Sequence, residues 1–537
     1  MSGSSIIGMS AVARYAIASL SLIQSFIRSR SQDEIVTTSY NWDVICSSTA
    51  NSPVDYRSLM LAAACWMAQS GTTAMAIAES PAPPPLAEIQ IGAPGRQIPS
   101  NFMGLSHEWG DSRNFLGSAS VGRNLIYRQL IANLTAYGNG PIELRIGGDS
   151  TDATKEPTPA FIAPFADVAR DTGAHFILGV NLAAGDPQLA VRQAKFYLSL
   201  MPPGSVDAIE VGNEPDLYTR HGRRDLSFSI SAYLAEIDQW RKALLPVLPP
   251  GVKLAGPAWN SYGFGSVFMH SHLDEFEKRQ QGALGVFTWH YYQTSPQSHP
   301  GPDYFLDSHA ATDGPDQVQS VVQLSHANGI PFRAAEINSI NGVGVHGASD
   351  DFATALWAID TMFEYLRVGV DGVNWEASDG NYDNPFYFSV NQSVNPNTFS
   401  LKYVSPLYCG LLFFQAATGN RARMLAVSLH TPEKVNLKVW ATLDGTDAEH
   451  IVVINKDKYR GGEVVFPSGG RTQATVRRLL APSPESTSNV TFAGQSFDGS
   501  KDGRPLGAPQ VEKLNCSRQS CSVPVPPASA ALVTLAY

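Results

Sequence analysis

From about residue 100 the chain repeats one pattern: a short β-rich apolar run, then a longer stretch with apolar positions at helical spacing. Strands are predicted at 102–108, 142–148, 175–182, 206–213, 253–259, 286–292, 332–338 and 372–377, with helices between them that include 161–170, 189–200, 230–244 and 352–366. Eight such units over roughly 300 residues favour a (β/α)8 barrel, or TIM barrel. An open sheet that binds a dinucleotide would need a glycine-rich turn after its first strand, and residues 109–112, Trp-Gly-Asp-Ser, do not supply one.

The segments on either side of this repeat differ from it. Beyond about residue 421, strand patterns follow one another without helices, and Gly, Pro, Asp and Ser fill the gaps between them. They lie around Ser428 and at 435–441, 450–455, 474–480 and 532–537. This arrangement predicts an antiparallel β-sandwich over 421–537. Another strand is predicted at 86–91, so we expect the N-terminal segment 86–99 to join the sandwich and 100–420 to form the barrel.

Residues 1–85 are interpreted as a leader. An apolar stretch at 59–67 follows Arg57 and leads to Ala76-Ile77-Ala78, which is the layout of a secretory signal. An earlier stretch at 15–27 is either a membrane anchor or lies before the true start near Met60. The second alternative is favoured, because a spanning helix needs ~20 apolar residues and Arg14 interrupts the longer version of this stretch. The signal-like segment is thus 57–78, followed by a proline-rich linker.

Further features agree with export. Four tripeptides match the acceptor pattern for N-glycosylation, at Asn133, Asn391, Asn489 and Asn515. Beyond the leader the cysteines are Cys409, Cys516 and Cys521, and a disulfide between Cys516 and Cys521 is favoured over a bridge from Cys409 because the two are close in sequence. We therefore predict a secreted glycoprotein.

Composition and missing motifs argue against several classes of function. The chain has 537 residues with 16% charged residues and a formal net charge of −10, without a basic stripe, which argues against nucleic acid and anionic membranes as partners. The motifs of zinc metalloproteases, serine esterases and phosphate-binding loops are missing from the sequence. No obligatory protein partner is evident.

Polar residues gather where the predicted barrel strands end, which is where the chemistry of such barrels occurs. The segments are Ser106-His107-Glu108, Arg145-Ile146-Gly147-Gly148-Asp149, Asn213-Glu214-Pro215, Trp289-His290-Tyr291-Tyr292, Ala335-Glu336-Ile337-Asn338 and Asn374-Trp375-Glu376. Buried acids are costly unless they are paired or used, so this crowding of acids, amides and aromatics indicates a site.

Glu214 and Glu336 are the candidate catalytic pair. They follow strands four and seven, which lie across one barrel mouth from each other. Two opposed carboxyl groups can cleave a glycosidic bond: one protonates the leaving oxygen, and the other attacks the anomeric carbon or activates water, depending on their separation. Arg145 is the expected partner that keeps Glu336 ionised.

The neighbouring residues have less specific interpretations. Glu210 faces the same interior at greater depth and is interpreted as a structural acid, and Glu376 is slightly favoured as a rim acid without a role. His107 and His290 lack a third metal ligand, so no metal site is predicted, and sugar hydrogen bonds or core packing are the alternatives. Trp289 and Trp375 would either stack on a sugar or fill the top of the barrel.

These motifs resemble the β-glucuronidase and heparanase family of retaining (β/α)8 glycosidases, particularly its fungal and bacterial exo-acting β-glucuronidases. The resemblance rests on the segments around Glu108, Arg145, Glu214, His290 and Glu336 and spans about residue 86 to the C-terminus. It implies a barrel with a β-sandwich, net retention and no cofactor. It also implies Glu214 as the acid/base and Glu336 as the nucleophile. Ring hydroxyls would then be held by Glu108, Asp149 and Asn213.

The resemblance further implies that tyrosines and loop amides surround the carboxylate of a terminal β-glucuronate, with or without a 4-O-methyl group, in the carbohydrate substrate. The candidates are Tyr291 or Tyr292, Tyr382, and the amides of 341–344. Three alternatives stay open: a heparanase-like endo-β-glucuronidase, a neutral-sugar glycosidase of the same clan, and an inactive carbohydrate-binding protein. The acidic balance argues against the endo-acting enzyme, which would need a cleft rimmed by Lys and Arg.

Overall fold

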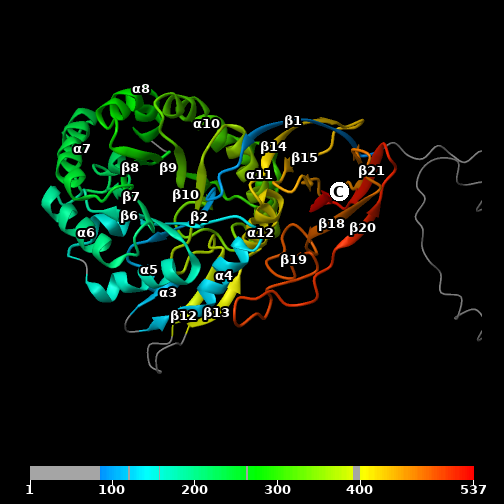
Figure 1. The fold of residues 1–537 in the computed structure, drawn as a ribbon, viewed down its shortest axis with the longest axis horizontal. Helices are drawn as coiled ribbons and strands as arrows, with labels where there is room; N and C mark the ends of the chain where they lie inside the picture. The colour runs from blue at the N-terminus through cyan, green and yellow to red at the C-terminus, as the bar shows by residue number, and fades with distance from the viewer. Residues whose placement is uncertain (1–84, 119–120, 157, 262–263, 391–398, 537) are drawn as a thin grey trace, which may run out of the picture. The chain divides into compact units, whose positions relative to one another are not determined.

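A computed structural model of the chain describes residues 85–118, 121–156, 158–261, 264–390 and 399–536 (Figure 1). The predicted leader lies outside these residues, as does Asn391. The described residues belong to one compact unit. In the described part, no helix is both long enough and apolar enough to cross a bilayer.

Eight parallel strands close into the predicted barrel in the order β10-β11-β2-β5-β6-β7-β8-β9. Their bounds are β2 (Met103–Glu108), β5 (Glu143–Gly147), β6 (His175–Val180), β7 (Val206–Val211), β8 (Lys253–Trp259), β9 (Leu284–Thr294), β10 (Phe332–Ile340) and β11 (Gly372–Glu376). Each of the eight predicted strands is therefore found, with ends that shift by a few residues at most. The closed order places β7 and β10 three steps apart, so residues at their carboxyl ends face each other across the mouth.

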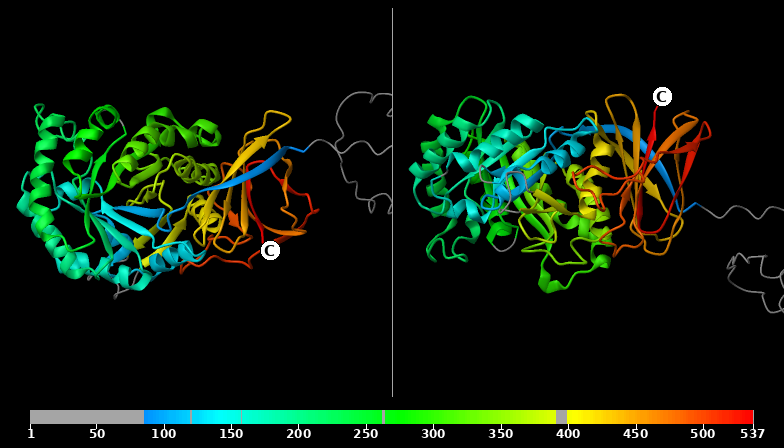
Figure 2. Two further views of the ribbon diagram at one scale, coloured as in Figure 1. Left: turned by 45° about the horizontal axis from the view of Figure 1, so that its top comes forward. Right: turned by 90° about the horizontal axis from the view of Figure 1, so that it is seen from below.

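Helices surround the barrel, as the apolar periodicity of the sequence requires (Figure 2). The long ones are α4 (Leu125–Thr135), α5 (Pro159–Thr172), α6 (Pro187–Leu200), α7 (Ile230–Leu244), α8 (Phe264–Arg279), α10 (Ser308–Ala327), α11 (Phe352–Arg367) and α12 (Pro406–Thr418). Short helices are α3 (Ser112–Leu116) and α9 (Pro302–Leu306). Two small hairpins, β3 (Gly117–Ser118) with β4 (Gly122–Arg123) and β12 (Phe386–Val390) with β13 (Phe399–Val404), complete this part.

The C-terminal part is the predicted β-sandwich. Its strands are β14 (Arg423–His430), β15 (Leu437–Leu443), β16 (Glu449–Asn455), β17 (Gly462–Pro467), β18 (Gln473–Leu480), β19 (Thr491–Phe492), β20 (Glu512–Asn515), β21 (Ser520–Val525) and β22 (Ser529–Leu535). The main path runs β19-β18-β22-β16-β15-β14-β1-β17-β21, and apolar residues from both ends of this path share one core, for example Ile451, Val464, Val523 and Val533. The sequence pattern did not predict β17, β19, β20 and β21.

The N-terminal strand β1 (Ala87–Gln97) belongs to this sandwich, as expected. It pairs antiparallel with β14 and parallel with β17, and Ala87 and Ile89 lie in the sandwich core. The described chain therefore starts in the sandwich, passes through the whole barrel and returns (Figures 1 and 2).

Buried polar contacts join the sandwich to helix α11. The Lys456 Nζ of the sandwich lies 2.8 Å from Asp360 Oδ2, with both side chains fully buried. Trp440 Nε1 donates to Asp360 Oδ1 at 3.0 Å, and Lys438 Nζ lies 3.0 Å from Glu364 Oε1. Since breaking a buried pair leaves an uncompensated charge, these contacts tie the two parts strongly.

Residues connected with export lie at different depths. Cys516 and Cys521 form a disulfide, whereas Cys409 is a buried free thiol in α12. Asn489 and Asn515 are exposed. Asn133 is half-buried, and its Nδ2 donates to the carbonyl of Gly503 at 2.7 Å, so the structure argues against the predicted glycan at this position.

Candidate active site

Glu214 and Glu336 meet at the carboxyl-terminal mouth of the barrel. Glu214 follows β7 and Glu336 lies in β10. One carboxylate oxygen of each lies within 4.8 Å of the other and of a ring nitrogen of His290, which belongs to β9. Their exposed fractions are 8% and 9%. The fold thus brings two distant acids into one water-poor site.

The backbone of Glu214 is held in an unusual conformation. Its φ is 45° and its ψ is 54°, which is the left-handed region that residues other than glycine rarely adopt. Such a residue costs of order 1–3 kcal/mol and persists only where its surroundings enforce it. Here the amide of Glu214 donates to Ala258 O at 3.0 Å, and Pro215 begins a turn of 3-10 helix directly after it. The strand stops abruptly, so the carboxylate is presented at the mouth.

The two acids have different partners. Glu336 Oε2 lies 2.6 Å from Arg145 Nη1, and the hydroxyl of Tyr292 donates to Glu336 Oε1 at 2.9 Å. Glu214 Oε1 instead accepts a bond of 2.6 Å from Asn260 Nδ2 and lies 3.0 Å from His290 Nδ1. Glu336 therefore lies against a full positive charge, whereas the amide that donates to Glu214 is neutral.

Arg145 is the centre of the deeper network. It is fully buried; its Nε lies 2.6 Å from Glu210 Oε2, and its Nη2 donates to Asn213 Oδ1 at 2.8 Å. Burial lowers the pKa of Arg145, but the carboxylates of Glu210 and Glu336 outweigh burial, and its pKa stays raised. Glu210 is therefore the structural acid that the strand pattern predicted.

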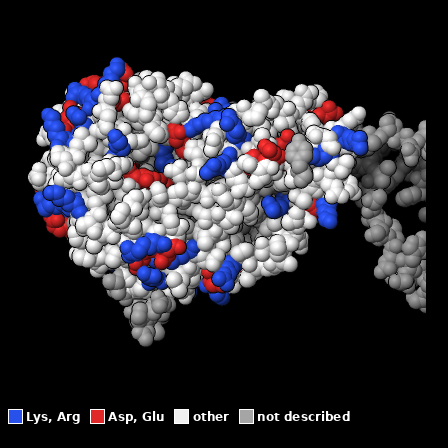
Figure 3. All heavy atoms as spheres, viewed as in Figure 1, with Lys and Arg blue, Asp and Glu red and all other residues white. Residues whose placement is uncertain are grey.

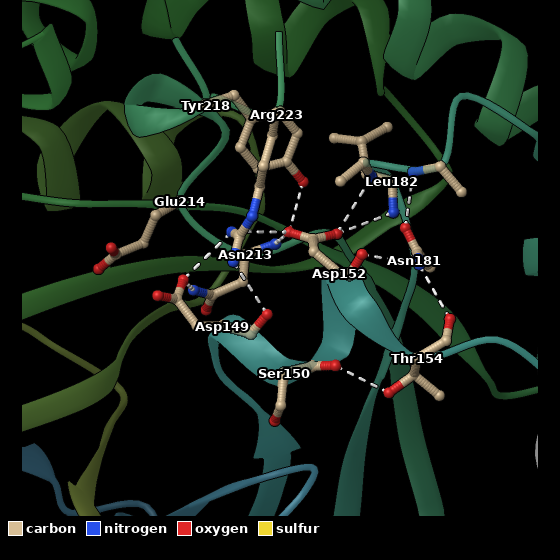
Figure 4. A network of polar contacts seen from close by, with 12 residues as sticks. Asp149, Ser150, Asp152, Thr154, Asn181, Leu182, Asn213, Glu214, Tyr218 and Arg223 are labelled. Carbon is tan, nitrogen blue, oxygen red and sulfur yellow. Dashed lines mark hydrogen bonds and ion pairs between the residues drawn. The ribbon is translucent and has the colours of Figure 1, made fainter. Parts of the chain in front are cut away.

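Asp152 positions Asn213 and was missed in the sequence (Figure 4). Its Oδ2 accepts from the Asn213 amide at 3.0 Å and from the Tyr218 hydroxyl at 2.6 Å, while its Oδ1 accepts from the amides of Leu182 and Ala183. Burial raises the pKa of Asp152, which these four bonds oppose. The signal was present as a second acid three residues after Asp149, but nothing in the sequence shows that it would face the end of β7.

Asp149 and Glu108 occupy the side of the mouth formed by β2 and β5. Asp149 Oδ1 accepts from Asn213 Nδ2 and from Arg223 Nη1, both at 3.2 Å. Glu108 accepts from the amides of Asp149 and Ser150 at 2.9 and 3.0 Å, and burial raises its pKa. A side chain at Gly148, whose φ is 76°, would collide with the Glu108 carboxylate, so this turn requires glycine.

Two of the three tyrosine predictions need correction. Tyr291 does not face the mouth: its ring stacks on Trp289 and contacts Gly314 of α10, because side chains alternate along β9 and His290 and Tyr292 take the inner positions. Tyr292 faces the mouth and contacts the carboxylate of Glu336. Tyr382 is 48% exposed and lines a hollow of about 350 Å³ with His346, Tyr387 and Tyr403, and neither Glu214 nor Glu336 lines that hollow.

His107, Trp289 and Trp375 pack in the protein interior. His107 is buried between Ala377 O and the Tyr127 hydroxyl, and burial lowers its pKa to about 4. Trp289 and Trp375 are fully buried on the outer side of their strands, away from the mouth. The ring of Trp289 stacks on Tyr291, and Trp375 packs edge-on against Trp357 of α11, so neither is placed to stack on a sugar.

The cluster of Glu214, His290 and Glu336 also has the spacing of a metal site. Arg145 already supplies positive charge 2.6 Å from Glu336, so a cation would have to compete with it. The arrangement fits general acid–base and nucleophilic chemistry better than coordination.

Sequence comparisons find similarity to glycoside hydrolases. Residues 439–532 match the Glycosyl hydrolase family 79 C-terminal beta domain. A β-glucuronidase from Neurospora crassa is 22% identical over 533 residues, covering 83% of this chain and 94% of that protein. A β-glucuronidase from Aspergillus niger is 25% identical over 411 residues, covering 67% of this chain and 70% of that protein.

Solved structures show the same fold. A 4-O-α-L-rhamnosyl-β-D-glucuronidase from Fusarium oxysporum 12S gives a TM-score of 0.67 at 17% identity, with 83% of this chain and 100% of that chain covered. An arabinofuranosidase from Xanthomonas axonopodis pv. citri, assigned to GH51, gives 0.60 at 13% identity, with 84% and 100% covered. At these identities the likeness establishes the architecture, and the reaction has to be argued from the site.

Proposed function

Because the chain belongs to the β-glucuronidases of glycosyl hydrolase family 79, we propose that it releases terminal glucuronic acid from glycans or glycoconjugates with retention of configuration. The observation that carries the mechanism is the short separation of the two carboxylates. Their nearest oxygens lie within 4.8 Å. Retaining enzymes hold these groups ~5–5.5 Å apart, whereas inverting enzymes leave ~6.5–9.5 Å for a water molecule.

In the first step Glu336 is the nucleophile and Glu214 the acid. Glu336 attacks the anomeric carbon as the glycosidic C–O bond breaks, and Glu214 gives its proton to the departing oxygen. The bond from Arg145 keeps Glu336 ionised before attack, and the Tyr292 hydroxyl fixes the rotation of its carboxylate. Asn213, whose amide has a second N–H beyond the one that Asp149 accepts, would donate to the sugar 2-hydroxyl.

In the second step water replaces the leaving group. Glu214, now ionised, takes a proton from the water, and the oxygen attacks the anomeric carbon from the face that the leaving group left. The bond to Glu336 breaks, and two inversions give net retention. His290 Nδ1 lies 3.0 Å from Glu214 Oε1 and 3.7 Å from Glu336 Oε2. Its ring can therefore interact with either carboxylate as the negative charge passes from one to the other.

Exo action is supported by depth and charge. The two carboxylates are almost buried, which suits a terminal residue better than the middle of a chain. Arg223 and Arg224 beside the mouth are engaged with Asp149 and Glu236. Over the face shown in Figure 3, basic residues lie in small separate groups, some of them beside acidic residues, without a continuous basic track for a sulfated polymer.

A panel of aryl glycosides tests this function. We expect kcat/KM for the β-glucuronide to exceed that for the matching β-glucoside by about tenfold to a hundredfold per carboxylate contact, since a hydrogen bond to a charged group contributes ~1.5–3 kcal/mol. NMR of the first-formed sugar should show the β anomer. Preference for a glucoside or an arabinofuranoside would favour the neutral-sugar alternative. Binding of glucuronide without turnover would favour the inactive carbohydrate-binding protein.

We further propose that the protein is exported and processed near Glu79. The disulfide Cys516–Cys521 and the exposed acceptors Asn489 and Asn515 support this, since disulfides persist in oxidising compartments. Expression from Met60 in a secreting eukaryotic host should place the protein in the medium, and mass spectrometry should find glycans at Asn489 or Asn515 and none at Asn133. A native protein that retains residues 1–78 would contradict this proposal.

A further inference from the structure

Two carboxyl groups at the mouth have no part in the mechanism above. Glu376 ends β11, and Asp383 lies in the loop after it; their exposed fractions are 4% and 1%. Asn338, which lies two residues after Glu336 on the same face of β10, donates from Nδ2 to Glu376 O at 2.9 Å and to Asp383 O at 2.8 Å. This amide fixes both acids at the mouth, on the side of the nucleophile. Glu376 was expected to be a rim acid without a role, but it is buried.

The carboxyl groups of Glu376 and Asp383 differ in their hydrogen bonds. Glu376 Oε1 accepts from the hydroxyl of Ser378. Neither carboxyl oxygen of Asp383 is bonded to another described residue, and its own backbone amide is the donor nearby. Buried polar groups are nearly always hydrogen-bonded, so a carboxyl group left in this state points to a group that arrives with the substrate.

The charges around Asp383 favour its neutral form. Burial, and then the Glu336 carboxylate, raise the pKa of Asp383 well above its usual range. Burial, Glu336, Glu376 and Asp383 in turn raise the pKa of Tyr292. Burial, Glu336 and Glu108 raise the pKa of Glu376 likewise. Arg145 interacts with Glu376, but it is already bonded to Glu210 and Glu336. In the protonated form that these effects favour, Asp383 offers an O–H donor.

A negatively charged sugar entering this mouth needs donors. Three arginines near the mouth are each paired with a carboxylate: Arg145 with Glu336, Arg223 with Asp149 and Arg224 with Glu236. A second ionised acid beside a uronate would repel it, whereas a neutral acid can donate to it. Hydrogen bonds from O–H to an ionised oxygen are among the strongest in proteins.

Building on the proposed function, we propose that Asp383 reads the carboxylate of the glucuronyl residue by donating its own carboxylic proton to one of the carboxylate oxygens. The substrate stays ionised and the proton stays on Asp383, so no bond is made or broken. Binding requires that Asp383 carries its proton. Selectivity for a uronate over the neutral sugar should therefore be greatest at low pH and should fall as pH rises through the pKa of Asp383.

The experiment measures kcat/KM against pH for an aryl β-glucuronide and the matching β-glucoside on the same preparation. The ratio of the two values cancels the titration of Glu214 and Glu336, which both substrates share, and it cancels the fraction of protein that is folded. For the wild type this ratio should fall by about tenfold to a hundredfold with rising pH, which corresponds to the loss of one hydrogen bond to a charged group. The kcat/KM of the glucoside should lack this additional decline.

Variants identify the titrating group. In D383N the ratio should be nearly independent of pH, because a carboxamide donates without titrating. In D383A it should be low at every pH. E376Q should keep the decline, and so should D351N, which removes another buried acid whose pKa is raised to about 8 but which caps α11. Y292F should slow both substrates equally, because its hydroxyl contacts Glu336.

Three outcomes would overturn the inference. The first is a wild-type ratio that does not change with pH while β-glucuronide is hydrolysed well, which would leave the proposed function intact. The second is a decline that disappears in E376Q and persists in D383N. The third is a D383A variant that slows both substrates by the same factor, because Asp383 would then contact a ring hydroxyl. An enzyme with no β-glucuronidase activity at any pH would instead reject the proposed function itself, and this inference with it.

Discussion

Replacing Glu336 with alanine should lower turnover of an aryl β-glucuronide by on the order of 10⁵-fold, the scale seen when a covalent nucleophile is removed. Without this carboxylate no glycosyl-enzyme can form, and Arg145 and Tyr292 face an empty space. Azide is small and anionic and can enter that space beside Arg145. We therefore expect azide to restore part of the activity and to give the α-glucuronosyl azide, which NMR identifies.

The matched control is Glu336→Gln, which fills the space with a neutral group of the same shape. It should be as inactive as the alanine variant but should not respond to azide. A β-configured azide product, or rescue of the glutamine variant to the same extent, would show that Glu336 is not the nucleophile. Residual activity above a few per cent in freshly purified E336A would also show that Glu336 is not the nucleophile.

Replacing Glu214 with glutamine should make the rate depend on the leaving group. General acid catalysis contributes ~10²–10⁴-fold where the departing oxygen needs a proton. A phenyl β-glucuronide should lose activity on that scale, whereas a dinitrophenyl glucuronide should form its glycosyl-enzyme nearly as fast as with the wild type, because this leaving group departs without a proton. Stopped-flow kinetics with both substrates measures the difference as a burst followed by slow turnover.

The carboxamide in the Glu214→Gln variant can occupy the position between Asn260 and His290 that the carboxylate takes, so loss of packing is not expected. Thermal unfolding of the variant checks this. If both leaving groups slow by the same factor, Glu214 does not act as the acid. An external nucleophile such as azide should then fail to speed breakdown of the intermediate.

The barrel was predictable because each of its strands carries a local signal. The run 175–182 is apolar and contains Phe, Ile, Leu and Val, and the structure places β6 at His175–Val180. The strands β17 and β21 escaped prediction because their apolar positions are interrupted by Glu463, Pro467 and Pro524. They form strands because neighbouring strands of the sandwich provide their backbone hydrogen bonds. A short window of sequence does not show which strands will be neighbours in space.

The catalytic pair was predictable for a related reason: the strand order of a closed barrel fixes which strand ends face one another. Rotation about the strand axis was harder to foresee. Tyr291 and Tyr292 are adjacent and chemically identical in sequence, and only the inward position of His290 decides that Tyr292 contacts Glu336 and Tyr291 contacts α10. Asp383 lies beside the predicted Tyr382, but the loop turns the aspartate inward and leaves the tyrosine in a surface hollow. Loop geometry of this kind depends on contacts such as Gly344 with Asp383, which sequence spacing does not encode.

The path of β1 has a consequence for protein engineering. Since β1 lies between β14 and β17 and then leads directly into the first barrel strand, the sandwich is not a cassette that can be cut from one end of the gene and grafted elsewhere. A fragment that starts at the barrel would leave β14 and β17 without the strand that joins them, exposing two unpaired edges of the kind that invite aggregation. Exchange between relatives would have to move the strand ahead of the barrel together with the C-terminal strands, and would also have to carry over the buried pair of Lys456 and Asp360.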